Sequence, residues 1–323
     1  MALLEVQQIS KRLQGGLLID QISFGQQVLQ KIAIAGESGA GKTTLLRMIS
    51  GHAQPDSGII LFNGKRVIGP EEKLLAGHKE IGYLSQEHDL LHNYKVEDLV
   101  WFGNNLSDEE AATLFEICQI ADLMKRSTNH LSGGEKQRIA LCMLLAKSPK
   151  MLILDEPFSN LDPIHTEILK AVIEDITERL KITCLLTSHD PNDTLSWADE
   201  IIVMKKGKII QQGAPEIIYH QPVDEYVAGM FGRYNLITSE QAAFFSINSK
   251  RKNIIIRPGD FIISINLENG VRGIVQKISF CGSFYEVEVM VCGFTIIGRI
   301  VKNEWKAGEE VYVKINVQDN NSK

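Results

Sequence analysis

The chain has 323 residues, a length that suits two domains better than one. Its hydrophobic fraction of 44% can support proper cores, and its net charge of −6 argues against general nucleic-acid binding, which requires a basic face. No nucleic-acid partner is therefore expected.

The cysteines and the apolar runs indicate in which cellular compartment the protein is expected. The cysteines show no C-x-x-C spacing and are expected to be reduced, buried and cytosolic: Cys118, Cys142, Cys184, Cys281 and Cys292. The chain opens without a basic-then-apolar leader, and no apolar stretch approaches the roughly 18 residues that cross a bilayer. Any membrane association is therefore expected to come through a partner protein.

The first motif along the chain is a glycine-rich loop, GESGAGKT, at Gly36–Thr43. Residues 31–35 predict a buried strand before it, and residues 43–50 have helical spacing. This context favours a phosphate-binding loop over an ordinary glycine-rich turn, because backbone N–H groups and a helix N-terminus then face phosphate oxygens. Lys42 is expected to reach the outer phosphates, and Thr43 to hold Mg²⁺. The predicted ATP contacts are Gly36, Glu37, Ser38, Gly39, Ala40, Gly41, Lys42, Thr43 and Thr44.

A second candidate anion site is LSGGEKQR at Leu131–Arg138. Ser132, Gly133 and Gly134 stand just before a helix-patterned run at residues 135–148, so their N–H groups lie at a helix N-terminus. The alternative interpretation is an ordinary N-cap followed by an amphipathic helix.

Residues 151–162, MLILDEPFSNLD, predict a buried strand that ends in two acids. Burying adjacent carboxylates is costly unless a metal or proton chemistry uses them. Asp155 fits the Mg²⁺-binding acid of phosphate-loop ATPases, and Glu156 is the candidate base that activates the attacking water. The alternative for Glu156 is an acidic N-cap of the helix that Pro163 begins.

A further strand, predicted at residues 182–188, runs directly into His189. The carboxyl ends of strands in an α/β sheet are where ligands bind, so that His189 is a candidate site residue. A satisfied structural histidine is the alternative.

KKGK at Lys205–Lys208 predicts a solvated hairpin turn in which Gly207 supplies the bend.

The C-terminal third has a different pattern. From about Ser239 to Val317, short alternating runs separated by glycine-containing turns predict a small β-barrel or sandwich. Taken alone, this region is also consistent with a dimerisation or packing module.

These motifs resemble those of the ATP-binding subunit of an ATP-binding cassette (ABC) transporter, in the family's order through the N-terminal two-thirds of the chain. The resemblance matches Gln86 to the family's glutamine loop, residues 131–138 to its signature, and SNLD at Ser159–Asp162 to its aspartate loop. It implies that Asp155 binds Mg²⁺, that Glu156 is catalytic and that His189 is the switch histidine.

The resemblance also implies how the subunit works. ATP is expected to be held between the phosphate loop of one copy and the signature of another, in a homodimer. Residues 87–130 match the helical subdomain that contacts the membrane permease, with Gln86 as a hinge that senses Mg²⁺ and water; a plain pair of surface helices is the alternative. Leu13 stands where the family usually has an adenine-stacking aromatic residue, so weaker adenine discrimination is expected.

The C-terminal region resembles the transport-associated oligonucleotide-binding-like (TOBE) domain of certain bacterial importers, in RPGDFIIS at Arg257–Ser264 and AGEEVYVKI at Ala307–Ile315. The expected fold class is α/β: a phosphate-loop ATPase cassette with a helical subdomain at residues 1–238, followed by a small all-β OB-like domain at residues 239–323.

The expected function is ATP hydrolysis that powers solute uptake through a permease, from the cytoplasmic face of the inner membrane. An extracytoplasmic binding protein is expected to deliver the solute, with ferric iron or a polyamine preferred. A cassette ATPase without a permease, of the translation or DNA-repair type, is the alternative. A nucleotide kinase shares the phosphate loop but does not explain the signature.

Overall fold

A computed structural model describes residues 2–13, 16–86, 90–101, 106–247 and 252–316. The chain forms two compact units, Met1–Pro215 and Glu216–Lys323. The domain boundary predicted between residues 238 and 239 and the helical subdomain predicted at residues 87–130 stay predictions.

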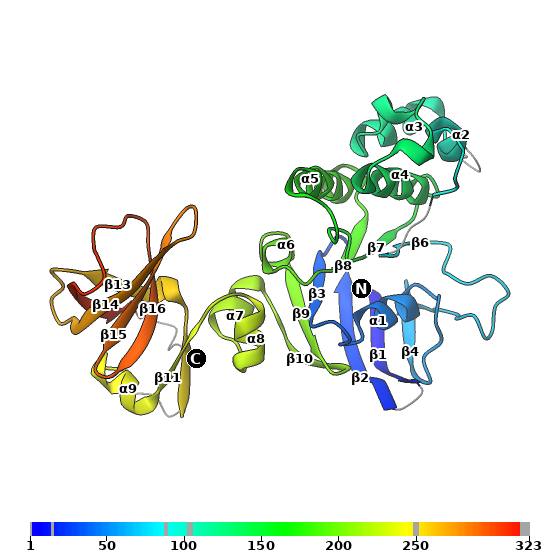
Figure 1. The fold of residues 1–323 in the computed structure, drawn as a ribbon. Helices are drawn as coiled ribbons and strands as arrows, with labels where there is room; N and C mark the ends of the chain where they lie inside the picture. The colour runs from blue at the N-terminus through cyan, green and yellow to red at the C-terminus, as the bar shows by residue number, and fades with distance from the viewer. Residues whose placement is uncertain (1, 14–15, 87–89, 102–105, 248–251, 317–323) are drawn as a thin grey trace. The chain divides into compact units, whose positions relative to one another are not determined.

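The first unit contains two sheets that share a core. Within the described residues, one is an antiparallel sheet with strand order β2-β1-β4-β5. Its strands are β1 (Ala2–Leu13), β2 (Gly16–Gln27), β4 (Ser57–Phe62) and β5 (Lys65–Arg66). Helix α1 (Lys42–Ile49) packs against both sheets, because its buried side chains belong to one cluster that includes Leu4 and Ile202 (Figure 1).

The second sheet of this unit has strand order β10-β9-β3-β8-β7-β6 among the described residues. Its strands are β3 (Ile32–Gly36), β6 (Ile81–Leu84), β7 (Met151–Asp155), β8 (Thr183–Thr187), β9 (Glu200–Lys205) and β10 (Lys208–Gly213). All pairs are parallel except β9 with β10. Every residue of β3, β7 and β8 is buried, as parallel strands covered on both faces require. The strands predicted before the glycine-rich loop, before the paired acids and before His189 are therefore confirmed.

The predicted hairpin turn is also confirmed, since Lys208 pairs with Lys205. Both central residues have positive φ, 47° at Lys206 and 78° at Gly207, as a tight turn between twisted strands requires. A Cβ on Gly207 would lie 2.3 Å from the carbonyl oxygen of Leu18, so only glycine fits there.

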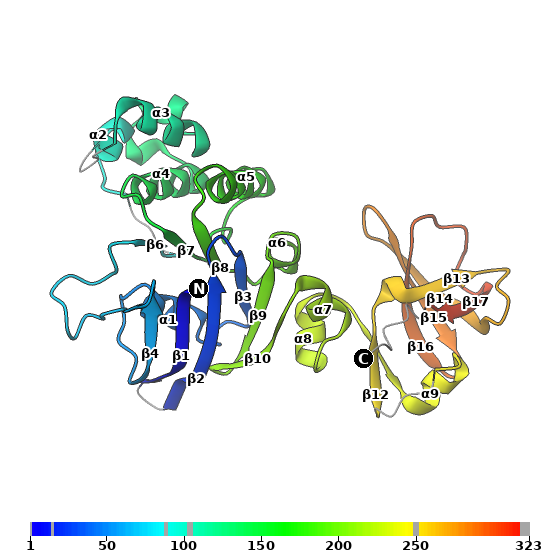
Figure 2. The same ribbon diagram turned by 180° about the vertical axis from the view of Figure 1, so that it is seen from behind.

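Helices cover the β6–β8 part of the large sheet, and the two opposite views agree on this arrangement (Figure 1, Figure 2). The helical elements of this part are α2 (Val96–Trp101), α3 (Asp108–Ile117), η1 (Ala121–Leu123), η2 (Thr128–His130), α4 (Gly133–Leu145) and α5 (Pro163–Arg179), whereas α6 (Pro191–Leu195) follows β8 and contacts β3. Ser107 and Ser132 each begin a helix with a capping box, which satisfies backbone donors that the first turn leaves free. Among the described residues, no helix combines the length and apolar character needed to span a bilayer.

The second unit is mainly antiparallel β structure. Its sheets have strand orders β11-β12 and β13-β17-β14-β15-β16 among the described residues. Its strands are β11 (Asn235–Thr238), β12 (Asn253–Ile256), β13 (Phe261–Ser264), β14 (Val271–Phe280), β15 (Tyr285–Val291), β16 (Phe294–Ile300) and β17 (Glu310–Ile315). Its helical elements are α7 (Pro215–His220), α8 (Glu225–Met230), α9 (Ser239–Phe244) and η3 (Pro258–Asp260). The inward-facing residues of these strands, among them Val287 and Val313, form a separate apolar core, which confirms the predicted small β domain.

Arg257 explains why the α7–α8 segment packs with the second unit. Its guanidinium group, in a side chain that is almost fully buried, donates hydrogen bonds to the carbonyl oxygens of Tyr219 (2.9 Å), Ala228 (2.8 Å) and Gly232 (3.2 Å). It also lies over the Tyr219 ring, 4.2 Å from the centroid. Burying a guanidinium is costly unless its donors find partners, and here the chain before β11 supplies them for Nε and Nη1, whereas Nη2 is buried without a hydrogen-bond partner.

The expectation of uniformly buried cysteines is wrong for two of them. Cys118, Cys142 and Cys184 are buried, but Cys281 and Cys292 are exposed. Cys281 follows the end of β14, and Cys292 has a positive φ of 48° in the turn between β15 and β16. Hairpin turns lie at the surface, and the apolar strands around these cysteines concealed that position.

Candidate nucleotide-binding site

The glycine-rich loop connects the end of β3 to the start of α1, in the strand–loop–helix context that the motif requires. Gly39 and Gly41 have φ values of 81° and 100°, which favour glycine. A Cβ on Gly36 would lie 2.6 Å from the carbonyl oxygen of Met204, so side chains are excluded at that point also. The conformation of the loop therefore depends on its glycines.

Lys42 is buried at the base of this loop. Its Nζ donates to the carbonyl oxygens of Gly36 (2.8 Å) and Glu37 (3.3 Å), and lies 3.4 Å from Oε1 of Glu156. The ammonium group thus joins the glycine-rich loop to the acid that follows β7. The structure brings these two sequence-predicted groups together.

Asp155 is the most connected acid of the site and is almost completely buried. Its Oδ1 accepts hydrogen bonds from Oγ1 of Thr43 (3.2 Å) and of Thr187 (2.9 Å). Its Oδ2 accepts from the hydroxyl of Tyr83 at 3.1 Å. Burial and the adjacent carboxylate of Asp155 raise the pKa of Tyr83, so that its hydroxyl stays a donor near neutral pH. Thr43 and Asp155 offer hard oxygen atoms, the donor type that suits Mg²⁺.

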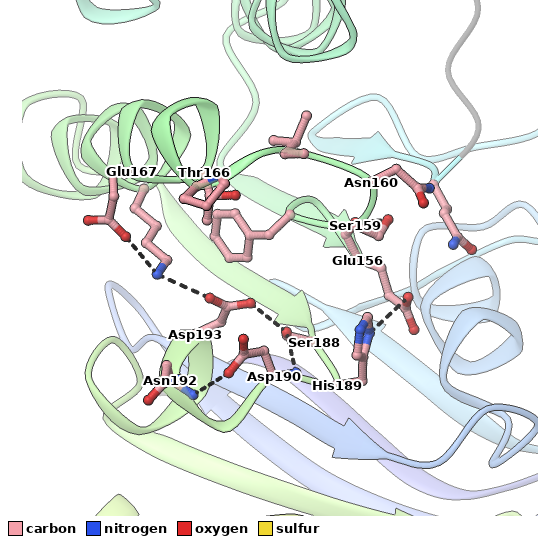
Figure 3. Close-up of a pocket in the computed structure, with 15 residues that line it drawn as sticks. Glu156, Ser159, Asn160, Thr166, Glu167, Ser188, His189, Asp190, Asn192 and Asp193 are labelled. Carbon is pink, nitrogen blue, oxygen red and sulfur yellow. Dashed lines mark hydrogen bonds and ion pairs between the residues drawn. The ribbon is translucent and has the colours of Figure 1, made fainter. Parts of the chain in front are cut away.

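Glu156 follows in a conformation that is uncommon for a residue with a side chain, with φ of 47°. Its backbone N–H donates to Oγ1 of Thr187 at 2.8 Å, which helps hold this turn. Its carboxylate lies between Lys42, which contacts Oε1, and His189, whose Nδ1 is 3.4 Å from Oε2 (Figure 3). The turn therefore aims Glu156 away from Asp155, and the two adjacent acids serve different neighbours.

The N-cap interpretation of Glu156 is wrong. The cap of α5 is Asp162, whose Oδ1 accepts from the backbone N–H groups of Ile164 and His165, both at 3.0 Å. Glu156 lies too early in the chain to reach that helix end.

Gln86, Glu156 and His189 line one pocket of about 700 Å³. The aspartate loop forms another wall of it, with Ser159 and Asn160, and α6 contributes Asp193 (Figure 3). Two hydrogen bonds of Ser188 hold the backbone next to His189. Its Oγ donates to Oδ2 of Asp193 at 2.9 Å and accepts from the Asp190 N–H at 3.0 Å. The predicted residues from three separate loops thus share one accessible space.

The signature residues stand elsewhere in the unit. Ser132 is the N-cap of α4, its Oγ accepting from the Glu135 N–H at 3.3 Å, and Gly133 and Gly134 form the first turn. Both views show α4 apart from α1 (Figure 1, Figure 2). The two predicted anion-binding segments of one chain therefore do not form one site.

Leu13 ends β1 with 59% of its surface exposed, so it offers an open apolar face. Asp56 contacts both residues that precede Leu13: Nζ of Lys11 lies 2.6 Å from Oδ1 of Asp56, and the backbone N–H of Arg12 donates to Oδ2 at 2.7 Å.

Comparison with known proteins decides the family. A family profile described as "ABC transporter" matches residues 19–159. The sulfate/thiosulfate import ATP-binding protein of a Synechocystis species is 30% identical over 308 residues, covering 88% of this chain and 86% of that protein. The chain belongs to the ATP-binding subunits of ABC transporters.

Other relatives agree with this family. A ferric ion import ATP-binding protein of Pectobacterium atrosepticum is 33% identical over 243 residues, covering 74% of this chain and 70% of that protein. Among solved structures, cbiO1 of Clostridium perfringens, described as part of an ABC transporter complex, matches with a TM-score of 0.60 and 28% identity. The match covers 67% of this chain and 90% of that one. The predicted fold class and the assignment as an importer ATPase are confirmed.

Proposed function

We propose that two copies of this ABC importer ATPase close around two ATP molecules, each held between the phosphate loop of one copy and the signature of the other. The observation that carries the proposal is that both segments present helix N-termini suited to phosphate, yet lie apart in a single copy. A second copy, turned head to tail, supplies the missing half of each site.

In this proposal, different residues of the chain bind the phosphates and accept the proton of the attacking water. The loop N–H groups and Lys42 bind the phosphates, and Ser132, Gly133 and Gly134 of the opposite copy bind the terminal one. Glu156 accepts a proton from the attacking water. Lys42 lies 3.4 Å from Oε1 of Glu156, so that engagement of the ammonium by phosphate frees this oxygen for the water.

His189 has a supporting role in the same step. Its Nδ1 lies 3.4 Å from the other oxygen of Glu156, where it orients the carboxylate. We assign Mg²⁺ to the oxygen atoms of Thr43, Asp155 and Gln86, where it would neutralise charge on the phosphates. Leu13 is proposed to pack on the adenine ring.

Importer ATP-binding subunits of this family act with membrane permease components. We propose that residues 87–130 contact such a permease at the cytoplasmic face of the inner membrane, where the chain is a peripheral subunit. An extracytoplasmic binding protein delivers the solute. Ferric iron or a polyamine is the proposed solute, and the ferric ion relative supports the first. The sulfate relative is similarly close, which fits a division of labour in which other subunits select the solute.

Mixing inactive copies tests the shared site. Lys42→Ala breaks the phosphate-loop half, and Ser132→Arg breaks the signature half. A mixed dimer of the two retains one complete site, so that ATP turnover should return on mixing. Lys42→Ala mixed with Glu156→Gln is the matched control, because both changes fall in the same half and no complete site results. Wild-type turnover by Ser132→Arg copies alone would contradict the proposal.

A further inference from the structure

His165 lies between the signature and the aspartate loop of the same copy. It is the third residue of α5, and its Nδ1 is 2.6 Å from Oδ2 of Asp162. On the other side of the ring, Nε2 is 3.5 Å from Oγ of Ser132. The ring therefore contacts one side chain of the signature, Ser132, and one of the aspartate loop, Asp162.

Close packing fixes the position of this ring. A Cβ added to Gly134 would lie 2.9 Å from Cδ2 and 3.0 Å from Cβ of His165, so the imidazole lies directly against the signature backbone. No side chain larger than that of glycine fits between them. The glycine at position 134 therefore lets the ring approach α4 closely enough for Nε2 to lie 3.5 Å from Oγ of Ser132.

Asp162 determines which nitrogen of His165 carries hydrogen. The backbone N–H of His165 and then its ring lower the pKa of Asp162, which is therefore ionised near neutral pH and only accepts hydrogen bonds. Nδ1 must then be the protonated nitrogen, because it lies against Oδ2. In the neutral ring, Nε2 is left as an acceptor facing the Ser132 hydroxyl.

Ser132 has two contacts that together define its rotamer. Its Oγ accepts from the Glu135 N–H at 3.3 Å, and its hydroxyl hydrogen faces Nε2 of His165. Glu135 is itself held, since Oε1 pairs with Nη1 of Arg126 at 2.7 Å and Oε2 accepts from the Ser132 N–H at 2.8 Å. The hydroxyl is thus ordered before any ligand arrives, which lowers the entropy lost on binding.

We propose that His165 is a positioning residue: by accepting the Ser132 hydroxyl hydrogen it holds Oγ as the cap of the Glu135 N–H, so that the N–H groups of Gly133 and Gly134 at the start of α4 receive the terminal phosphate of ATP bound to the opposite copy. This inference rests on the proposed function, because it assigns a partner to the signature serine of the shared site. His165 touches neither nucleotide nor metal and acts through Ser132.

The test measures ATP-dependent dimerisation by light scattering in the Glu156→Gln background, across a range of ATP concentrations. His165→Asn keeps a donor near Asp162 but does not reach Ser132, whereas the longer His165→Gln places an amide near the position of Nε2. We expect His165→Asn to raise the ATP concentration at half-maximal dimerisation roughly three- to tenfold, as the loss of one hydrogen bond predicts. His165→Gln should stay within about twofold of the parent.

A double-mutant cycle separates positioning from general loss of structure. If His165 acts through the serine, the effect of His165→Asn should shrink below about twofold in a Ser132→Ala background. ATP affinity of the single copy, measured with a fluorescent ATP analogue, should not change.

The outcomes that overturn the inference are distinct. An unchanged response to His165→Asn, or an equal effect with and without Ser132, would overturn it while the ATP-dependent dimer of the parent still supported the proposed function. Absence of that dimer in the parent would overturn both.

Discussion

The hydroxyl of Tyr83 lies 3.1 Å from Oδ2 of Asp155, the oxygen that neither Thr43 nor Thr187 contacts. Both oxygens of this buried acid are therefore assigned, one to threonine hydroxyls and one to a tyrosine hydroxyl. The arrangement fixes the carboxylate at the carboxyl end of β7, next to the start of α1.

Tyr83→Phe removes that hydrogen bond and leaves Oδ2 without its donor. The variant should lose about 1 kcal/mol of unfolding free energy, measured by urea titration, because a buried acceptor is left unsatisfied. Since the free oxygen also turns more easily, the Mg²⁺ concentration for half-maximal ATPase activity should change by about twofold or more. A variant equal to wild type in both measurements would show that the contact orients nothing.

Thr187 links the two adjacent acids, since its Oγ1 accepts from Glu156 N–H at 2.8 Å and donates to Oδ1 of Asp155 at 2.9 Å. Thr187→Val removes both bonds with little change of shape, and Thr187→Ser keeps them. Thr187→Val should lower kcat about tenfold or more through misplacement of Glu156, while Thr187→Ser stays near wild type. Steady-state ATPase kinetics check this, and equal rates for the two variants would contradict it.

His52 makes stability depend on pH. Burial, and then the charge of Arg47, lower the pKa of His52, so the folded chain favours the neutral ring. The stabilising contribution is present above the ordinary value of 6.5 and is lost as pH falls through the lower folded-state pKa. Unfolding free energy should therefore fall as the pH drops below about 6.5, and the fall should be smaller in His52→Gln. Parallel pH profiles of wild type and variant would contradict this assignment.

The hydrogen bonds of Arg257 hold the α7–α8 segment against the second unit, so its loss should loosen that segment. Arg257→Lys keeps the charge but loses the planar fork that reaches several carbonyl oxygens. It should destabilise the second unit by about 2 kcal/mol and make residues 216–234 sensitive to limited proteolysis.

Removal of everything beyond residue 238 should likewise expose this segment, while basal ATP hydrolysis is largely kept. Complete loss of hydrolysis by a folded truncated chain would place the catalytic boundary farther along the sequence.

The local motifs of the site were predictable from the sequence, and its long-range partners were not. Gly36–Thr43, Asp155 and Glu156 lie at strand ends, where short patterns carry their own context. Tyr83 and Thr187 reach Asp155 from other strands of the sheet, and only the strand order β8-β7-β6 brings them to it. A tyrosine or threonine in an apolar strand gives no signal of that contact.

The same reason applies to the second unit. The alternating runs predict its strands, but the burial of Arg257 depends on carbonyl groups of a segment up to 38 residues earlier in the chain. Its place in RPGDFIIS suggests a turn, not a buried charge. The exposure of Cys281 and Cys292 was also missed, because apolar neighbours in sequence belong to strands and the cysteines to the turns beside them.

The mass of the Glu156→Gln chain with and without Mg²⁺ and ATP, measured by light scattering, tests the shared site most directly. Binding survives in this variant while activation of water fails, so the closed form should accumulate. A shared site predicts a monomer without ATP, a dimer with ATP, and a monomer under both conditions when Ser132→Arg is added. A monomer in saturating ATP, or a dimer that Ser132→Arg leaves intact, would contradict it.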